Sequence, residues 1–183
     1  MPRYVMKFRP VFILTLCMTA LTACQPNEGV LSRITERFPA ARTGQEMPAA
    51  ICAGDPALGQ RMTEAINAAR EGEGKTLLDP DTTLSGVAQS HACDIAATGR
   101  ASVAGSDGSN VVDRARAAGH PACGVTQLVS VGGTPEGIVG GWMASAAHRD
   151  ELLAQLNRQI GVGVARDNAG RPWWSVVIDK DCR

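Results

Sequence analysis

The sequence predicts an α+β domain in which several helices enclose a small, mainly antiparallel sheet. Apolar residues recur at helical spacing in most of the chain before residue 120, whereas three strand-like segments fall between residues 125 and 178. An Asp-Asn-Ala-Gly turn at 167–170 favours a hairpin between the last two of these segments. A length of 183 residues suits one ordinary domain.

Capping residues mark the ends of two long helices. Asp55-Pro56 is a cap followed by a proline suited to the first turn, and helical spacing continues to Gly72. A second helix begins near Asp81 and ends before Gly99. Shorter helices are expected at 111–118, 134–145 and 149–153. Strands are expected at 125–131, 159–165 and 173–178.

The first 23 residues have the features of an export signal. Three basic residues, Arg3, Lys7 and Arg9, precede an apolar run at 11–20 that is shorter than the roughly 20 residues needed to cross a bilayer. The segment ends in Leu-Thr-Ala-Cys24, which resembles the lipobox of bacterial lipoproteins. An ordinary secretory signal cleaved near a cysteine is the alternative. We expect cleavage before Cys24 and attachment of acyl chains such as palmitate to that residue.

This interpretation divides the chain into a lipoprotein signal peptide at 1–23, a tether at 24–51 and a folded domain at 52–183. The tether is expected from its mixed composition and its prolines. The expected location is the periplasmic side of the bacterial cell envelope, where the lipid on Cys24 would hold the exported protein to a membrane.

Charge and aromatic content exclude some classes of partner. Lys and Arg number 18, and Asp and Glu also number 18, so the chain lacks the basic excess of a nucleic-acid-binding protein. Outside the signal, the aromatic residues are Phe38, Trp142, Trp173 and Trp174. Such a small set does not suit an aromatic-lined cofactor pocket. We therefore expect neither a nucleic-acid partner nor a cofactor.

The cysteines predict two disulfides. Four cysteines remain after the signal is removed and Cys24 is lipidated: Cys52, Cys93, Cys123 and Cys182. An even number in an exported chain indicates disulfides. Four cysteines allow three pairings, and the sequence does not choose among them. We favour Cys93 with Cys123 and Cys52 with Cys182, because the second of these bonds would close nearly the whole domain.

Two histidines and two cysteines raise the question of a zinc site. His91 lies two residues before Cys93, and His120 lies three residues before Cys123. On a helix, positions two residues apart are about 200° apart, so His91 and Cys93 would not face one ion. An oxidising compartment also favours disulfides over thiolate ligands. We expect no metal site.

Ser145 and His148 are the weak candidates for nucleophilic catalysis. They are three residues apart, a spacing at which side chains meet on a helix. The alternative is a serine at a helix end and a histidine bonded to backbone, because no Asp or Glu is evidently placed to orient the imidazole. The charged pair Asp113-Arg114 is interpreted as solvated or capping charges.

Six short motifs follow one another along most of the chain. They are Leu78-x-x-Asp81-x-x-Leu84-x-x-x-Ala88-x-x-His91-Ala92-x-Asp94, Gly105-Ser106-Asp107-Gly108-Ser109, Asp113-Arg114, Ala118-Gly119, Trp142-Met143-x-Ser145-x-x-His148-Arg149 and Ile160-Gly161-Val162-Gly163. In order and spacing they resemble the bacterial branch of the CAP superfamily, or SCP domains, which includes cysteine-rich secretory proteins, antigen 5 and the plant pathogenesis-related class. The resemblance spans roughly Leu58 to Ile178 and implies an α-β-α sandwich.

The family's ligand cleft contains two histidines and two acidic residues, and this chain departs from that set. Val103 stands where the first His would be, Gln127 where the first Glu would be, and Ser145 at the second acidic position, as in many bacterial members. Only His148 matches. The loss of carboxylates and of one imidazole predicts no tightly held metal and argues against catalysis in this cleft.

The resemblance therefore implies a non-catalytic binding or envelope module. Its shallow groove would be formed by His148, Gln127, Ser145, Val103 and Trp142. The expected ligand is a small apolar molecule, since family members have been linked to sterol or lipid binding, or a glycan or an envelope protein. One rival is a hydrolase, either a protease or a cell-wall enzyme, that uses Ser145 and His148. Another is a purely structural domain whose groove is closed by side chains.

Overall fold

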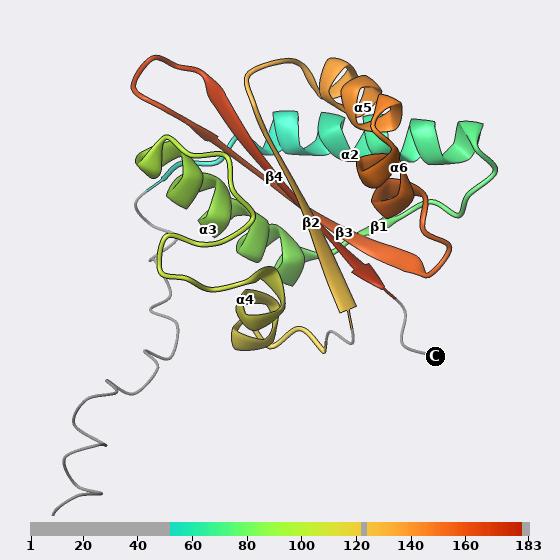
Figure 1. Ribbon diagram of the computed structural model, residues 1–183, viewed down its shortest axis with the longest axis horizontal. Coiled ribbons are helices and arrows are strands. Elements are labelled where there is room, and N and C mark those ends of the chain that lie inside the picture. The colour runs from blue at the N-terminus through green and yellow to red at the C-terminus, as the bar shows by residue number, and fades with distance from the viewer. Residues whose placement is uncertain (1–51, 122–123, 181–183) are drawn as a thin grey trace, which may run out of the picture. The chain divides into compact units, whose positions relative to one another are not determined.

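The computed structural model describes residues 52–121 and 124–180, which belong to one compact unit. The predicted signal peptide, the tether, Cys24, Cys123 and Cys182 lie outside the described residues. The elements are α2 (Pro56–Gly72), β1 (Asp79–Pro80), α3 (Thr82–Thr98), α4 (Val111–Ala117), β2 (Gly124–Val131), α5 (Pro135–Ala144), α6 (Ala146–Leu153), β3 (Asn157–Arg166) and β4 (Pro172–Lys180). Figure 1 shows their arrangement.

The four strands form one sheet in the order β1-β3-β4-β2. β4 is antiparallel to both of its neighbours, β2 and β3, and only the two-residue strand β1 is parallel, to β3. The predicted mainly antiparallel sheet is therefore confirmed. β1 was not expected, because the dipeptide Asp79-Pro80 has no alternating apolar pattern and becomes a strand only by lying beside β3.

Helices cover both faces of this sheet, so the predicted α-β-α sandwich is confirmed (Figure 1). Trp174, Val176 and Ile178 of β4 join the larger core cluster, to which α2, α5 and α6 also contribute. Val177, which points to the opposite face, packs with apolar residues of α3. Successive side chains of β4 thus point to opposite faces of the sheet, and the one strand contributes to both core clusters.

The helix boundaries agree with the predicted caps. Asp55 accepts a hydrogen bond from the Leu58 amide at 3.1 Å, and Asp81 accepts one from the Leu84 amide at 2.7 Å. Gly99 ends α3 with φ 68°, a left-handed conformation that glycine adopts without steric penalty. The last short helix, α6, begins at Ala146, three residues earlier than expected.

Two glycines of β3 allow α3 to lie directly on the sheet. A Cβ atom at Gly161 would overlap the backbone of Leu84 and Ser85, and one at Gly163 would overlap the backbone of Ala88 and Gln89. Each glycine therefore meets one turn of the helix. Their place inside a strand is explained by this close approach of two backbones.

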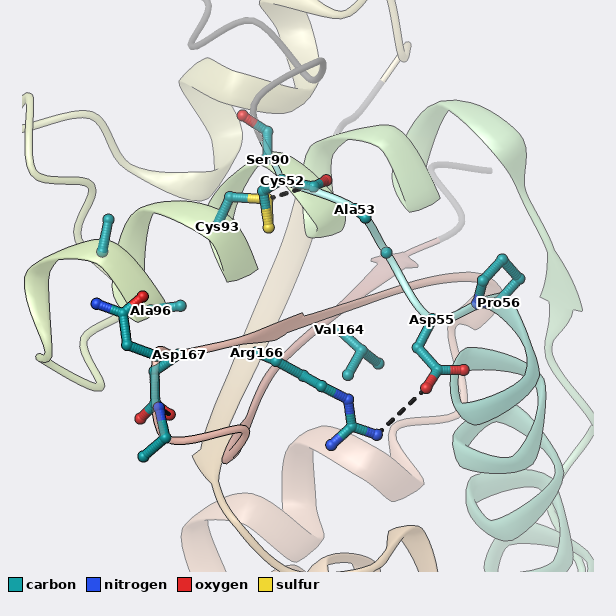
Figure 2. Close-up of a pocket in the computed structure, with 14 residues that line it drawn as sticks. Cys52, Ala53, Asp55, Pro56, Ser90, Cys93, Ala96, Val164, Arg166 and Asp167 are labelled. Atoms are coloured by element: carbon teal, nitrogen blue, oxygen red, sulfur yellow. Dashed lines mark hydrogen bonds and ion pairs between the residues drawn. A yellow bond between two sulfur atoms is a disulfide. The ribbon is translucent and has the colours of Figure 1, made fainter.

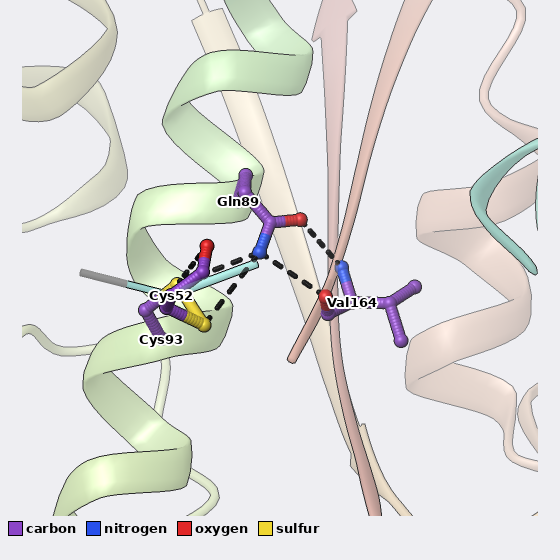
Figure 3. The surroundings of a disulfide bond; sticks show 4 residues. All are labelled: Cys52, Gln89, Cys93 and Val164. Atoms are coloured by element: carbon purple, nitrogen blue, oxygen red, sulfur yellow. Dashed lines mark hydrogen bonds between the residues drawn. A yellow bond between two sulfur atoms is a disulfide. The ribbon is translucent and has the colours of Figure 1, made fainter. Parts of the chain in front are cut away.

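The favoured disulfide pairing was wrong, because Cys52 is bonded to Cys93 with a Cα–Cα distance of 5.7 Å (Figure 3). Cys52 lies in the segment that precedes α2, and Cys93 lies on α3. Folding brings these segments together across 41 positions of sequence, which no local pattern reveals. Cys123 and Cys182, the other members of the favoured pairs, lie outside the described residues.

Candidate functional site

The structure brings Val103 and Gln127 together through a third residue, Arg114. Gln127 lies on β2 and is 9% exposed. Its Oε1 accepts a hydrogen bond from Arg114 Nη2 at 2.7 Å, and its Nε2 donates to Ser175 Oγ at 2.8 Å. Both ends of the amide are thus engaged by the protein itself.

Arg114 on α4 also holds the loop that carries Val103. Its Nη2 donates to the Val103 carbonyl at 2.9 Å, and its Nη1 donates to the carbonyl and hydroxyl of Ser109 at 2.8 and 2.9 Å. Burial lowers the pKa of this guanidinium, while Asp107, Asp94 and Asp113 act in the opposite direction. Arg114 stays cationic, and its interpretation as a solvated or capping charge was wrong.

His91 and Asp94 support the same loop from α3. The His91 ring is 1% exposed, and its Nε2 lies 2.7 Å from the Ser102 carbonyl oxygen. Because that oxygen can only accept, the proton is assigned to Nε2. Burial, followed by the nearby Arg114 charge, lowers the pKa of His91 and favours the neutral ring. Asp94 Oδ2 accepts from the Ser106 amide at 2.8 Å.

Ser145 and His148 form a second contact, as their spacing predicts. Ser145 lies between α5 and α6, and its Oγ is 3.0 Å from His148 Nδ1. The His148 side chain is exposed. Among the residues that the structure describes, no carboxylate is hydrogen bonded to this imidazole, so the third member of a catalytic triad is not found there.

Among the five residues predicted to form a cleft, the structure shows two separate groups of contacts. Gln127 points to the face that α3 covers, as do its strand neighbours of the same parity, whereas Trp142 lies in the core cluster on the other face and is 6% exposed. Val103 has an exposed side chain, at 50%. Assembly of all five predicted residues into one groove stays a prediction.

Two of the four candidate zinc ligands, Cys93 and His120, have other partners in the described structure. Cys93 is bonded to Cys52, and His120 is buried with its Nε2 at 3.3 Å from Asp179 Oδ2 and its Nδ1 at 3.9 Å from Asp81 Oδ1. Cys123 lies outside the described residues. Within residues 52–121 and 124–180, no three His, Cys, Asp or Glu side chains are grouped so that they could hold a metal ion.

Two grooves that the sequence did not reveal lie around α2 and α3. One has a volume of about 900 Å³ and lies beside the disulfide, with Arg166 and Asp167 on its wall (Figure 2). The other has a volume of about 990 Å³ and is lined by residues of α2 and α3 together with Ile160 and Val162 of β3. Each is built from several distant segments, so no contiguous motif could have revealed it.

The family of this protein follows from comparison with known sequences. The profile of the CAP family, described as the cysteine-rich secretory protein family, matches residues 63–178. The chain therefore belongs to the CAP family, and the resemblance inferred from its motifs is confirmed. No curated protein sequence matches the chain.

Solved structures support the same fold. An outer surface protein of Borrelia burgdorferi superposes with a TM-score of 0.65 at 16% identity, over 72% of this chain and 99% of that one. An extracellular protein of Bacillus anthracis that contains an SCP domain gives a TM-score of 0.61 at 19% identity, over 69% of this chain and 41% of that one. A cysteine-rich secretory protein of Staphylococcus aureus gives 0.55 at 18% identity, over 69% and 39%.

At these identities the similarity establishes the fold alone. For the last two structures the chain spans about two fifths of the solved protein. In the part of the chain that the structure describes, every helix is too short or too polar to traverse a bilayer.

Proposed function

We propose that this protein is a non-catalytic CAP domain that is lipid-anchored through Cys24 in the bacterial cell envelope and binds a ligand there. The observation that carries the proposal is the state of Gln127. Its amide replaces the family's first Glu and is occupied on one side by the Arg114 guanidinium, at 2.7 Å, and on the other by Ser175.

A fixed cation at this position disfavours a metal ion. Divalent metals are bound by carboxylates and neutral imidazoles, and a neighbouring guanidinium repels them. Arg114 supplies the positive charge, and Val103 replaces a potential imidazole with an aliphatic side chain that is half exposed. The groove expected around these residues therefore suits an uncharged, partly apolar ligand, or a glycan or envelope protein that presents such a surface.

The anchor is supported by the order of basic residues, apolar run and Leu-Thr-Ala-Cys24 in the leader. The similar Borrelia protein is an outer surface protein, and the similar Bacillus protein is extracellular. These descriptions agree with an exported location for this chain.

Metal content and lipidation test the two halves of the proposal. After dialysis without chelator, the purified protein should contain metal at far below one equivalent by elemental analysis. In a bacterial host, Cys24→Ser should move the protein from the detergent-extracted membrane fraction to the soluble fraction, or leave it unprocessed. Stoichiometric zinc bound through His148 would refute the metal-free domain. Membrane retention of a processed Cys24→Ser protein would refute the lipid anchor on Cys24.

A hydrolase is the second candidate, because the Ser145 hydroxyl does lie 3.0 Å from His148 Nδ1. In this mechanism His148 would remove the hydroxyl proton as Ser145 attacks an ester or amide carbonyl. The exposed position of His148 and its lack of a carboxylate partner in the described residues weigh against it. Turnover on a panel of ester, peptide and cell-wall substrates that disappears in both His148→Ala and Ser145→Ala would establish this function instead.

A further inference from the structure

The outer edge of β3, on the side away from β4, is only partly paired. β1 pairs with it at Gln159 and Ile160, and the Asp81 amide donates to the Ile160 carbonyl at 2.8 Å. In the described part of the chain no strand continues along this edge beyond Ile160. The backbone groups farther along β3 must therefore find other partners or remain open to the solvent.

At Val164 a side chain takes the place of the missing strand. Gln89 Nε2 donates to the Val164 carbonyl at 3.1 Å, and the Val164 amide donates to Gln89 Oε1 at 3.0 Å (Figure 3). These two bonds reproduce the pair that a neighbouring strand would make with one residue. They also show that the Val164 backbone points away from β4.

Val162 lies midway between these two occupied positions. In an antiparallel ladder, alternate residues turn their N–H and C=O groups to the same side, so Val162 points outward like Ile160 and Val164. Neither β1 nor Gln89 reaches it, and no other hydrogen bond to its outward groups is found within the described residues. Val162 lines the 990 Å³ groove and is partly exposed.

The groove is open on its α3 side at Gly86, while on its α2 side the Cβ position of Gly59 lies 3.8 Å from the Val162 carbonyl oxygen. Gly86 on α3 has no side chain. A Cβ atom added at Gly86 would have no other atom within 4 Å.

The charged side chains in the lining of the groove are Asp55, Glu64 and Glu71. Arg166 pairs with Asp55 at 3.3 Å, so the negative charge that faces a ligand comes from Glu64 and Glu71. A bound segment with a basic side chain would be favoured by this charge.

We propose that this groove binds an extended peptide segment of a partner protein, by pairing one residue of the segment with the Val162 backbone and placing a Lys or Arg near Glu64 and Glu71. The peptide backbone supplies the donor and acceptor that Val162 lacks, as in other cases of strand addition to a sheet edge. This site is distinct from the groove expected around Gln127 and His148, and it does not depend on the function proposed above.

The test uses a fluorescein-labelled pentapeptide, acetyl-Thr-Val-Lys-Val-Thr, and the full-length protein in detergent micelles. Fluorescence anisotropy measures binding, and hydrogen exchange followed by mass spectrometry measures protection of the Val162 amide. The expected result is saturable binding that weakens with salt, together with slower exchange at Val162. A peptide N-methylated at the lysine amide, or one with Glu in place of Lys, should bind at least about 10-fold more weakly.

Matched variants locate the site. Gly86→Leu places a side chain in the groove at a position where a Cβ meets no atom within 4 Å, and it should weaken binding at least about 10-fold. Gly140→Leu, at an equally open Cβ position on α5, should leave binding unchanged. Circular dichroism checks that both variants fold. Absence of binding at millimolar peptide, or equal binding by the Gly86→Leu protein, refutes the proposal. Protection of Val162 by an N-acetylglucosamine oligomer but not by the peptide would refute the peptide as ligand.

Discussion

Single residues decide how closely the layers of this protein approach. Gly163 is buried where α3 crosses β3, and any Cβ there meets helix backbone that has no rotamer with which to move aside. We predict that Gly163→Ala lowers the free energy of unfolding by about 3 kcal/mol, at the upper end of the usual range for overpacking. Urea denaturation measures this change.

The control for that prediction is Gly140→Ala on α5. A Cβ at Gly140 has open space, and alanine is favoured over glycine in a helix by about 1 kcal/mol. This variant should be slightly more stable than the natural protein. If Gly163→Ala proves equally harmless, the close packing of α3 on β3 is wrong.

Asp167 organises the hairpin between β3 and β4. Its carboxylate accepts a hydrogen bond from Trp173 Nε1 at 3.0 Å and from the Arg171 guanidinium at 2.9 Å. The Trp173 bond, followed by the bonds from Arg171 and Ala169, lowers the pKa of Asp167 from 3.8 to about 2. The folded protein therefore prefers the ionised carboxylate more strongly than the unfolded chain does.

The pH dependence follows from this direction. The contribution of Asp167 to stability should be complete above the unfolded pKa of about 4 and should be lost as the pH falls to about 2. Asp167→Asn should lower the melting temperature at pH 6, and the difference from the natural protein should shrink between pH 4 and pH 2. A difference that is constant across this range would contradict the assigned contacts.

At the scale of elements, the disulfide ties the segment before α2 to α3. In the chain-entropy model, a loop closed over 41 positions stabilises the fold by about 4 kcal/mol. We predict a loss of this order for Cys93→Ser, measured by urea denaturation under non-reducing conditions. Cys52→Ser should lose the same amount, and the double variant should lose no more. Peptide mapping of the unreduced protein identifies the bonded cysteines. A peptide that links Cys93 to Cys123 would contradict the Cys52–Cys93 bond.

Element boundaries were predictable because their causes are local. Asp55, Asp81 and Gly99 end or begin their helices through groups within four residues of themselves. The partner of Cys93 was not predictable, because it depends on which segment packs over α3. The pairing of the Gln89 side chain with the Val164 backbone was not predictable either. No sequence pattern marks a helical glutamine that takes the place of a neighbouring strand.

At the scale of the whole molecule, the residues predicted to form one cleft come from two layers of the sandwich. Gln127 and Arg114 lie with the α3 face, whereas Ser145 follows α5 on the other face. Because Arg114 already supplies a cation beside Gln127, we predict that treatment with a chelator leaves the melting temperature unchanged. A clear drop that added zinc reverses would show that a metal stabilises the fold.

Sequence alone determined the family of this protein, its helices and its main strands, and it predicted that three of the family's four cleft residues are replaced. Those features follow from spacing, capping and residue identity, which are properties of short segments. Tertiary structure alone decided the Cys52–Cys93 bond, the role of Arg114 and the open edge at Val162. Each of these depends on which distant backbone lies beside a residue, and that is settled only when the layers pack.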